Sequence, residues 1–452
     1  MHPREGGRKI FGQPVSRRDF LRRSAITAAS IPTASALLAA CGGKPGSGGT
    51  GTAALTDPAR RDNPITYDIN EHNGDLLLKE GLKPEGGPLE IFNWEEYINP
   101  TEVKRFEDAF GVQVNITTFT TMVDAVTRLT TREQNYDVIM GLTLDFVGRM
   151  VALDLLRPLQ HSYIPNLDAN IWPSLTTDAN APFYDVGSHY TVPYTLFTTG
   201  VGYRIDKGPT DHITMDLSYL EDAVPAMDNP WDLLWDPKFK GYSHMMDDYR
   251  DTFAMAMLRK DPNADINTGD PAVINAARDD VVEAIKTVGT KFDVNDYVDM
   301  PEGRAYVHQS WSGDLVSVQY YYPSWSDRDM IRYWVAPMPP EKAPIGSDVN
   351  AILANGKNPV LAHGFLNYLL DFEAGMRNFK WNGYIPPMKK ITSPSMVVKG
   401  SPDAIAEFAI TPPGLENCIP QESDFINGVM ELELTTEAEN LWKDAWEVVQ
   451  TT

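Results

Sequence analysis

From Leu89 onward, short apolar segments alternate with amphipathic ones, as is typical of an α/β fold. Residues 89–94 predict a buried strand, and Asn99-Pro100-Thr101 predicts a helix start, with Gly111 closing that helix. The next predicted elements are a strand at 112–116, a helix at 124–131 and a strand at 136–141. Strands and helices in this alternation imply a parallel sheet whose faces are covered by helices.

Ligands of parallel α/β sheets bind beyond the carboxyl ends of the strands. The pattern therefore places candidate binding side chains in three loops, at residues 93–97, 117–121 and 141–145. From Leu89 to residue 452 there are about 360 residues, too many for one compact core. We therefore expect two lobes.

The first 40 residues have the pattern of an export signal. Arg17 and Arg18 precede an uncharged stretch at 24–40 that Pro32 interrupts. A membrane-spanning helix needs about 20 strongly apolar residues, so this stretch favours a twin-arginine targeting signal. Leu-Ala-Ala directly before Cys41 has the form of a lipoprotein cleavage site and predicts a lipid on Cys41. The alternative, an ordinary N-terminal helix with an incidental cysteine, does not explain the order of these signals.

Residues 41–87 are rich in Gly, Pro, Ser, Thr and Asp and predict a flexible tether. About 45 flexible residues reach roughly 35–40 Å, enough for the body to meet a transmembrane partner. Within the tether, residues 75–82 predict one short helix packed on the body. Cys418 has no partner once Cys41 is lipidated, so we expect a buried apolar residue or an inert thiol.

Charge narrows the classes of partner. The chain has 39 Lys and Arg against 62 Asp and Glu, and residues 1–40 hold seven of the basic and two of the acidic residues. The remainder has 32 against 60, a net charge of −28. Such a surface repels nucleic acid and anionic headgroups and attracts cations, which excludes a nucleic-acid-binding protein. Because acidic surfaces also serve solubility, the excess favours a cationic ligand only modestly.

The chain contains several distinctive sequence blocks, at 91–100, 136–139, 192–194 with 200–203, 231–241, 247–251 and 382–386. The most specific blocks are Asn93-Trp-Glu-Glu-Tyr97 and Trp231-Asp-Leu-Leu-Trp-Asp-Pro-Lys-Phe-Lys-Gly241. In these blocks and in their order, the chain resembles the spermidine/putrescine-binding proteins of bacterial ABC importers from about residue 88 to its end. The last 50 residues match only loosely.

The resemblance implies an α/β fold of two lobes, each a mostly parallel sheet flanked by helices, which form a periplasmic-binding-protein-like clamp of type II. The ligand would bind between the lobes, and crossovers would fall near 194–200, 345–350 and 387–392. The implied division is a signal peptide (1–40), a tether (41–87), lobe 1 (88–196 and 346–390) and lobe 2 (197–345 and, as C-terminal helices, 391–452).

A polyamine is a row of ammonium groups joined by methylenes. Its site needs carboxylates, each worth about 1.5–3 kcal/mol as a charge-assisted acceptor, and aromatic faces worth roughly 0.5–2 kcal/mol per contact. The residues that the resemblance implies for this purpose are Trp94, Glu96, Tyr97, Thr117, Asp248, Asp251, Trp311, Asp348 and Tyr384.

Several of these residues have a structural alternative. Trp94 and Tyr97 could be core residues at a strand end. Asp248 could cap the helix that begins at Tyr249, with Asp251 stabilising the positive helix end, and both roles are compatible with ligand binding. Asp348, in a Gly/Ser segment, could be a turn residue.

The chain also departs from the family pattern. Gly346 stands where the family often has a tryptophan, and Phe119 where it often has a tyrosine. Asp251 replaces a longer acid, and Glu95 adds one beside the first aromatic wall. We therefore expect a wider or rearranged cleft that still accepts a di- or polyamine.

An enzyme is the competing class. The sequence has no phosphate-binding loop, nucleophile elbow, zinc-protease motif or dinucleotide fingerprint. Glu95 and Glu96 are adjacent at a strand end and point apart, which argues against a glycosidase pair. The histidines show no metal-ligand spacing along the chain, so surface or structural roles are expected and neither metal nor cofactor is predicted. They are His2, His72, His161, His189, His212, His244, His308 and His363.

The sequence thus predicts a monomeric, lipid-anchored binding protein on the extracytoplasmic face of the membrane. It would capture polyamines such as spermidine or putrescine and deliver them to the permease of an ABC importer. Another cationic or zwitterionic solute, or a ligand-sensing lipoprotein, is the alternative. A zwitterion or an anion would need an arginine, for which Arg250 and Arg304 are the candidates.

Overall fold

The computed structural model describes residues 58–131, 134–326, 329–338 and 343–452. The predicted twin-arginine signal at 1–40 and the predicted lipidation site Cys41 lie outside these residues. Among the residues described, no helix has both the length and the apolar character needed to cross a bilayer.

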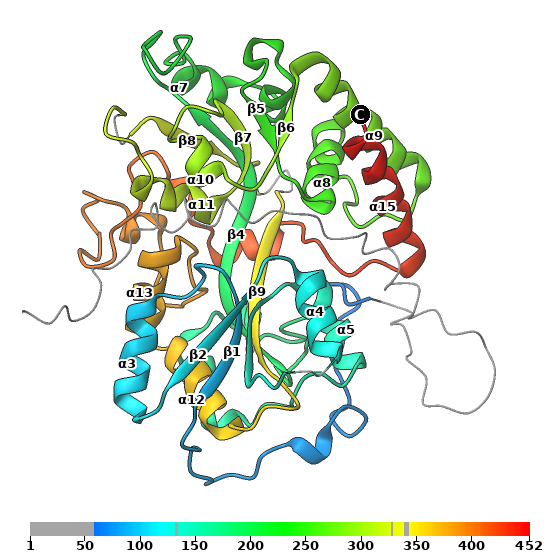
Figure 1. Cartoon of the computed structure of the whole chain (residues 1–452), viewed down its shortest axis with the longest axis vertical. Coiled ribbons are helices and arrows are strands. Elements are labelled where there is room, and N and C mark those ends of the chain that lie inside the picture. Colours follow the sequence, from blue (N-terminus) through cyan, green and yellow to red (C-terminus); the bar gives the residue numbers. More distant parts are fainter. Residues whose placement is uncertain (1–57, 132–133, 327–328, 339–342) are drawn as a thin grey trace, which may run out of the picture. The chain divides into compact units, whose positions relative to one another are not determined.

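A mixed β-sheet runs through this part of the chain. Its strand order is β2-β1-β3-β9-β4-β7-β5-β6, and β8 pairs with β4 (Figure 1). The strands are β1 (Leu89–Trp94), β2 (Val114–Phe119), β3 (Val138–Leu142), β4 (Thr191–Arg204), β5 (Ser243–Met245), β6 (Lys291–Phe292), β7 (Val307–Trp311), β8 (Ile331–Trp334) and β9 (Ile345–Ile352).

The first lobe is built on the parallel strands β2, β1 and β3. Between β1 and β2 runs α3 (Pro100–Phe110): Asn99 caps its start by accepting a bond from Thr101 N, and Gly111, with φ 67°, ends it in the left-handed conformation. The other α-helices of this lobe are α4 (Met122–Thr131), α5 (Leu144–Ala152), α6 (Asn166–Asn170), α12 (Pro359–Leu369) and α13 (Phe372–Asn382).

The second lobe is built on the parallel strands β7, β5 and β6. Helices α8 (Tyr249–Lys260), α9 (Pro271–Val288) and α15 (Thr436–Gln450) pack on one another beside this sheet (Figure 1). The shorter helices are α7 (Leu220–Ala223), α10 (Asp296–Asp299), α11 (Ser312–Ser317) and, in the C-terminal segment, α14 (Glu422–Asn427).

Strands β4 and β9 join the two lobes. β4 pairs antiparallel with β9 over Thr191–Thr198 and with β7 over Thr199–Tyr203, so that one continuous strand belongs to both sheets. The predicted crossovers at 194–200 and 345–350 therefore lie in β4 and β9. Near the third predicted crossover, at 387–392, Ile385 forms an isolated β-bridge with Leu196 of β4.

Two main clusters of buried side chains follow most of this division, although the first also includes Leu315 of α11, Tyr333 of β8 and Phe425 of α14. The first surrounds β1, β3, β9 and helices α12 and α13. The second gathers around β5, β7, α8, α9 and α15, with Trp442 fully buried. The predicted α/β, two-lobed architecture is confirmed. The C-terminal segment is divided between the clusters, since Phe408 and Leu415 belong to the first and α15 to the second.

Local predictions differ from the structure at two places. The second strand lies at 114–119 instead of 112–116, in register with β1 from Leu89↔Val114 to Trp94↔Phe119. The short helix predicted at 75–82 is replaced by a single 3₁₀ turn, Gly74–Leu76. Leu77 and Leu82 are exposed and Gly81 has φ 78°, so this segment has neither an apolar face to bury nor a helical backbone.

Residues 58–87, expected to be flexible, make specific contacts with the body. Tyr67 is buried, the Tyr190 hydroxyl donates to His72 O at 2.5 Å, and Arg157 donates to Leu76 O at 2.6 Å. Glu85 accepts a bond from Leu361 N, at the start of α12. This segment is therefore a strap held by hydrogen bonds, which composition alone does not reveal.

Candidate functional site

The first aromatic wall lies where β1 ends beside β3. The Trp94 indole donates to Gly141 O at 2.7 Å, and its ring is 4.7 Å from that of Phe119. Gly141 has φ 70°, and a Cβ there would lie 2.5 Å from the Trp94 ring and 2.8 Å from the Tyr97 ring. A glycine at this position is what lets both rings approach the end of β3.

Tyr97 joins this wall to the crossover strands. Its buried hydroxyl is 2.6 Å from Thr195 Oγ1 on β4 and donates to Asp348 on β9. Burial is the main reason that the pKa of Asp348 is raised to about 7. The predicted pair Tyr97 and Asp348 is therefore brought together, and Asp348 lies within a strand and not in a turn.

A row of aromatic rings leads from the first lobe to the second. The Tyr384 ring is 5.6 Å from that of Tyr97 and 5.7 Å from that of Phe197, whose ring is in turn 6.2 Å from that of Trp311. A Cβ on Gly346 would lie 2.1 Å from the Phe197 ring. Phe197 thus occupies the space opposite the glycine that departs from the family pattern, and a side chain at this position would clash with its ring.

The two aspartates of the second lobe differ in their contacts. Asp248 caps α8 by accepting bonds from Arg250 N at 2.7 Å and Asp251 N at 3.2 Å. Asp251 points elsewhere: its carboxylate accepts bonds from Thr199 Oγ1 at 2.9 Å and from the Trp311 indole at 3.2 Å. Helix capping therefore explains Asp248 but not the orientation of Asp251.

Two further acids join this pair. Asp145, at the start of α5, interacts electrostatically with Asp248. Glu431, from the C-terminal segment, offers a carboxylate oxygen within 4.8 Å of those of Asp248 and Asp251. The acid cluster is defined here as Asp145, Asp248, Asp251 and Glu431.

Burial governs the charge of the acid cluster. Desolvation, followed by the charge of Asp248, raises the pKa of Asp251 to about 7. Desolvation likewise raises the pKa of Asp145 and raises that of Glu431 well above its ordinary value. Within the described residues, Glu431 Oε1 is buried and has no hydrogen-bond partner. An unpaired buried acceptor is costly and is relieved by a bound donor.

A second acidic group lies beside Tyr384, an inner ring of the aromatic row. Tyr384 hydrogen-bonds to Asp314, and Asp314 interacts electrostatically with Asp296. Burial, then the charge of Asp314, raises the pKa of Asp296 well above its ordinary value. Asp296 Oδ2 is also buried without a hydrogen-bond partner in the described part of the chain. Acidic groups therefore lie beside two of the rings, Trp311 and Tyr384.

The two candidate anion-binding arginines are engaged elsewhere. Arg250 donates to Leu432 O at 3.1 Å and to Asn267 Oδ1 at 2.7 Å, and its guanidinium lies over the Trp442 ring. Its charge partly offsets the burial that raises the pKa of nearby Asp145. Arg304 is paired with Asp299 and Glu302. This arrangement favours a cation over an anion beside the acid cluster.

Two predicted residues lie apart from these contacts. Glu96 is exposed at the turn after β1, with φ 57°. Thr117 lies inside β2 instead of on a loop, because the strand continues to Phe119. It lines a cavity of about 500 Å³ together with Glu90, Tyr136 and Asp137. We therefore remove Thr117 from the candidate site.

Sequence reasoning missed five residues of the site, for different reasons. Asp145 ends one of the three loops marked by strand order, Asp314 follows Trp311 by three residues, and Phe197 falls in a predicted crossover. Asp296 and Glu431 had no such signal, and Glu431 lies in the region where the resemblance is loosest.

Comparison with known proteins decides the family. The family model described as bacterial extracellular solute-binding protein matches residues 102–404. The chain belongs to this family. Among curated relatives, this solute-binding protein is 26% identical over 316 residues to the spermidine/putrescine-binding periplasmic protein of Escherichia coli, covering 69% of this chain and 82% of the relative. It is 28% identical to the putrescine-binding periplasmic protein of the same species, covering 64% and 75%. The resemblance inferred from the sequence blocks is confirmed.

Solved structures support the fold of this solute-binding protein. The TpPotD lipoprotein of Treponema pallidum matches 80% of the chain with 99% of its own length, at a TM-score of 0.62 and 21% identity. A putative spermidine/putrescine ABC transporter protein from Listeria monocytogenes matches 80% of the chain with 98% of its own length, at a TM-score of 0.61 and 20% identity.

Proposed function

We propose that this protein captures polyamines between its lobes and delivers them to the permease of an ABC importer. The observation that carries the proposal is the pairing of buried acidic groups with a row of aromatic rings, contributed by both lobes. Relatives named for binding spermidine and putrescine support the same ligand class. The role proposed is binding and release, with no chemical step.

Each part of the site has a role in this proposal. The acid cluster accepts bonds from ammonium groups at one end, and Asp296 with Asp314 does so at the other. The rings of Trp311, Phe197 and Tyr384 cover the methylene segment between them. A charge-assisted bond to each buried carboxylate replaces the water lost on burial, so binding stabilises oxygens that are otherwise unpaired.

In this proposal the lobes move apart to admit the ligand. Tyr97 bonds to Asp348 within the first lobe and Trp311 bonds to Asp251 within the second, so the ligand must also displace some of these contacts to reach the carboxylates. We assign this motion to bending of β4 and β9, the strands shared by both sheets. A ligand shifts the equilibrium between open and closed forms only by contacting both lobes, as Asp145 and Asp251 allow.

The same proposal includes the location of the protein. A twin-arginine signal at 1–40 would export the chain, and the lipid on Cys41 would anchor it as a monomer on the extracytoplasmic face. Labelling with a radioactive fatty acid in the wild-type chain and in Cys41→Ser tests the anchor. Equal labelling of both would overturn this part of the proposal.

Calorimetric titration tests the ligand class. The purified chain is titrated with putrescine, spermidine, spermine and arginine at two salt concentrations. We expect a polyamine to bind most tightly and to weaken as salt increases, because the contacts are ionic. Tighter binding of arginine would favour a zwitterionic solute instead. Absence of a permease and an ATPase gene beside this one would favour a ligand-sensing lipoprotein.

The variant Asp248→Asn separates binding from capping. Asparagine caps helices about as well as aspartate, so the melting temperature should change little. Loss of one charge-assisted bond should weaken polyamine binding by more than about tenfold. Unchanged affinity would show that Asp248 acts as a helix cap alone.

A further inference from the structure

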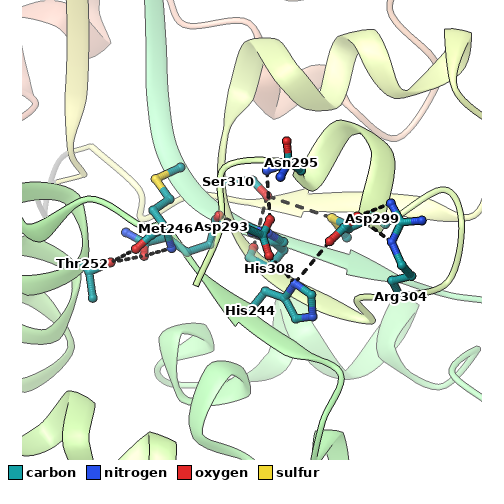
Figure 2. A network of polar contacts seen from close by, with 11 residues as sticks. His244, Met246, Thr252, Asp293, Asn295, Asp299, Arg304, His308 and Ser310 are labelled. Atoms are coloured by element: carbon teal, nitrogen blue, oxygen red, sulfur yellow. Dashed lines mark hydrogen bonds and ion pairs between the residues drawn. The ribbon is translucent and has the colours of Figure 1, made fainter. Parts of the chain in front are cut away.

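A second cluster of polar residues lies on the second lobe, apart from the proposed polyamine site. His244 and His308 are directly opposite each other on the parallel strands β5 and β7, so their side chains lie on the same face of the sheet. Asp293 follows β6, and Asp299 ends α10. Figure 2 shows the four side chains converging beneath the segment that contains α10.

The ligand atoms of His244, Asp293 and His308 all lie within 4.8 Å of one another, and Asp299 lies beside them. His244 Nδ1 is 2.8 Å from Asp293 Oδ2 and 3.7 Å from Asp299 Oδ2, and His308 Nε2 is 3.2 Å from Asp293 Oδ1. Zinc bonds of about 2.0–2.1 Å in a tetrahedron place ligand atoms about 3.3 Å apart. The observed distances lie on both sides of that value.

The orientation of His308 requires a positive charge between its ring and Asp293. His308 Nδ1 is 2.5 Å from Gln309 O, and a carbonyl only accepts, so Nδ1 holds the proton. In a neutral ring the lone pair of Nε2 then faces a carboxylate oxygen, which also has only lone pairs. Either a second proton or a metal ion removes this repulsion.

The surrounding charge also favours a cation. Asp293, Asp299 and Glu302 lie beside one arginine, Arg304, which pairs with the last two. Asp247 and Asp296 also interact electrostatically with Asp293, so acidic side chains outnumber basic ones in the described residues around the rings.

We propose that His244, Asp293 and His308 bind a divalent transition-metal ion, with Asp299 beside them. Two imidazole nitrogens with carboxylate oxygens suit zinc and its neighbours in the transition series better than calcium or magnesium. The site is distinct from the polyamine site and assigns a role to two histidines whose spacing along the chain gave no such signal.

The surroundings match those of metal ligands. His308 is oriented by Gln309 O, Asp293 Oδ1 accepts a bond from Asn295 N at 2.9 Å, and Asp299 accepts one from Arg304 Nε at 2.7 Å (Figure 2). Such outer contacts fix the orientation of ligand side chains in metal sites. The carboxylates of Asp293 and Asp299 are 18% and 14% exposed, which gives an ion access from the surface.

The ion would join segments that also carry the polyamine site. β5 leads to Asp248 four residues after His244, β7 ends at Trp311 three residues after His308, and α10 begins with Asp296. A bound ion therefore holds these segments in place without touching the polyamine. We expect it to raise the melting temperature by a few degrees at saturating concentration.

Zinc titration tests the proposal. The full chain, made without a polyhistidine tag and freed of metal with a chelator, is titrated with Zn²⁺ by calorimetry. We expect one ion per chain and the rise in melting temperature. Co²⁺ should give the strong visible absorption of a tetrahedral site. Asp293→Asn and His308→Gln should each weaken Zn²⁺ binding by at least about a hundredfold, and His212→Gln, at an exposed histidine, should not.

Three results would overturn the proposal. The first is absence of Zn²⁺ binding by the wild-type chain. The second is binding that survives both Asp293→Asn and His308→Gln. The third is loss of the bound ion in Glu431→Gln, which would place the ion in the acid cluster, where Asp248, Asp251 and Glu431 also converge. If circular dichroism shows that His308→Gln is unfolded, His244→Gln decides, because in the described residues its Nε2 has no partner to lose.

Discussion

Two acidic clusters of the molecule have carboxylates that behave in opposite ways. They are the acid cluster, to which both lobes contribute, and the histidine cluster of the second lobe, formed by His244, Asp293, Asp299 and His308. In the acid cluster, burial and the neighbouring Asp248 raise the pKa of Asp251 to about 7. In the histidine cluster, the contacts with His244 and His308 outweigh burial and hold the pKa of Asp293 far below its ordinary value. The segment around β5 contributes to both clusters, because His244 lies in the strand and Asp248 caps the helix that follows it.

The difference shows that the neighbouring groups, and not burial alone, decide whether a buried carboxylate is charged. Asp293 faces two imidazoles of its own lobe, so an ion or a proton held by those rings stabilises its charge. Asp251 and Glu431 have mainly other acids nearby, with Arg250 as a partial counterweight, so they gain most from a cation that comes from outside. The predictions below test this contrast, from the largest expected effect to the smallest.

The largest effect should come from pH. Polyamine binding requires ionised carboxylates, and Asp251 and Asp348 have pKa values raised to about 7. As pH falls from 8 to 6, protonation of each carboxylate should weaken polyamine binding by about tenfold, and protonation of both by about a hundredfold. Calorimetry across this range measures the change. If the midpoint of the pH dependence of polyamine affinity shifts in His244→Gln, the titrating groups belong to the histidine cluster, and the difference between the two clusters is wrong.

The same two groups set the pH dependence of stability. Their folded pKa values lie above the ordinary 3.8, so the folded state holds protons that the unfolded chain has lost. The free energy of unfolding of the ligand-free protein should therefore fall as pH rises from about 4 to about 7. Chemical denaturation over this range provides the measurement, and a rise over the same range would contradict the assignment.

Asp251→Asn should have the next largest effect. Loss of a charge-assisted acceptor of 1.5–3 kcal/mol should weaken polyamine binding by about 10- to 150-fold. The ligand-free variant should melt at a higher temperature at pH 8, because a buried charge beside Asp248 is gone. Asp279→Asn, at an exposed position on α9, is the matched control. A variant that loses both affinity and stability would indicate a structural role.

Trp311→Leu should have a smaller effect. The change removes one aromatic face, worth roughly 0.5–2 kcal/mol, and the indole donor to Asp251, so a loss of about tenfold in affinity is expected. Trp325→Leu, at a tryptophan that is 38% exposed, is the control. Equal affinities of the two variants in the titration would remove Trp311 from the site.

Thr117→Val should have the smallest effect. Thr117 lies within β2, and valine keeps its shape and its preference for strands. We expect less than a twofold change in polyamine affinity, as for the exposed Thr118→Val. A tenfold loss in Thr117→Val alone would return this residue to the binding site.

The sequence by itself determined the α/β class, the two-lobed division and the family. Strand β1, helix α3 and the helix cap at Asp248 followed from local patterns, because strand alternation, capping and helix termination depend on residues a few positions apart. The family resemblance also implied Tyr97, Asp251, Trp311, Asp348 and Tyr384, which the fold brings, with Phe197, into a connected set of contacts.

The tertiary structure alone decided which distant side chains meet. Glu431 reaches Asp251 from 180 positions further along the chain, and His244 reaches Asp293 and His308 through strand pairing that their spacing does not reveal. The packing of Phe197 against Gly346, and the strap formed by residues 58–87, have the same origin. Local patterns encode backbone conformation, whereas burial, and with it the pKa of each carboxylate, depends on contacts between segments that sequence order does not bring together.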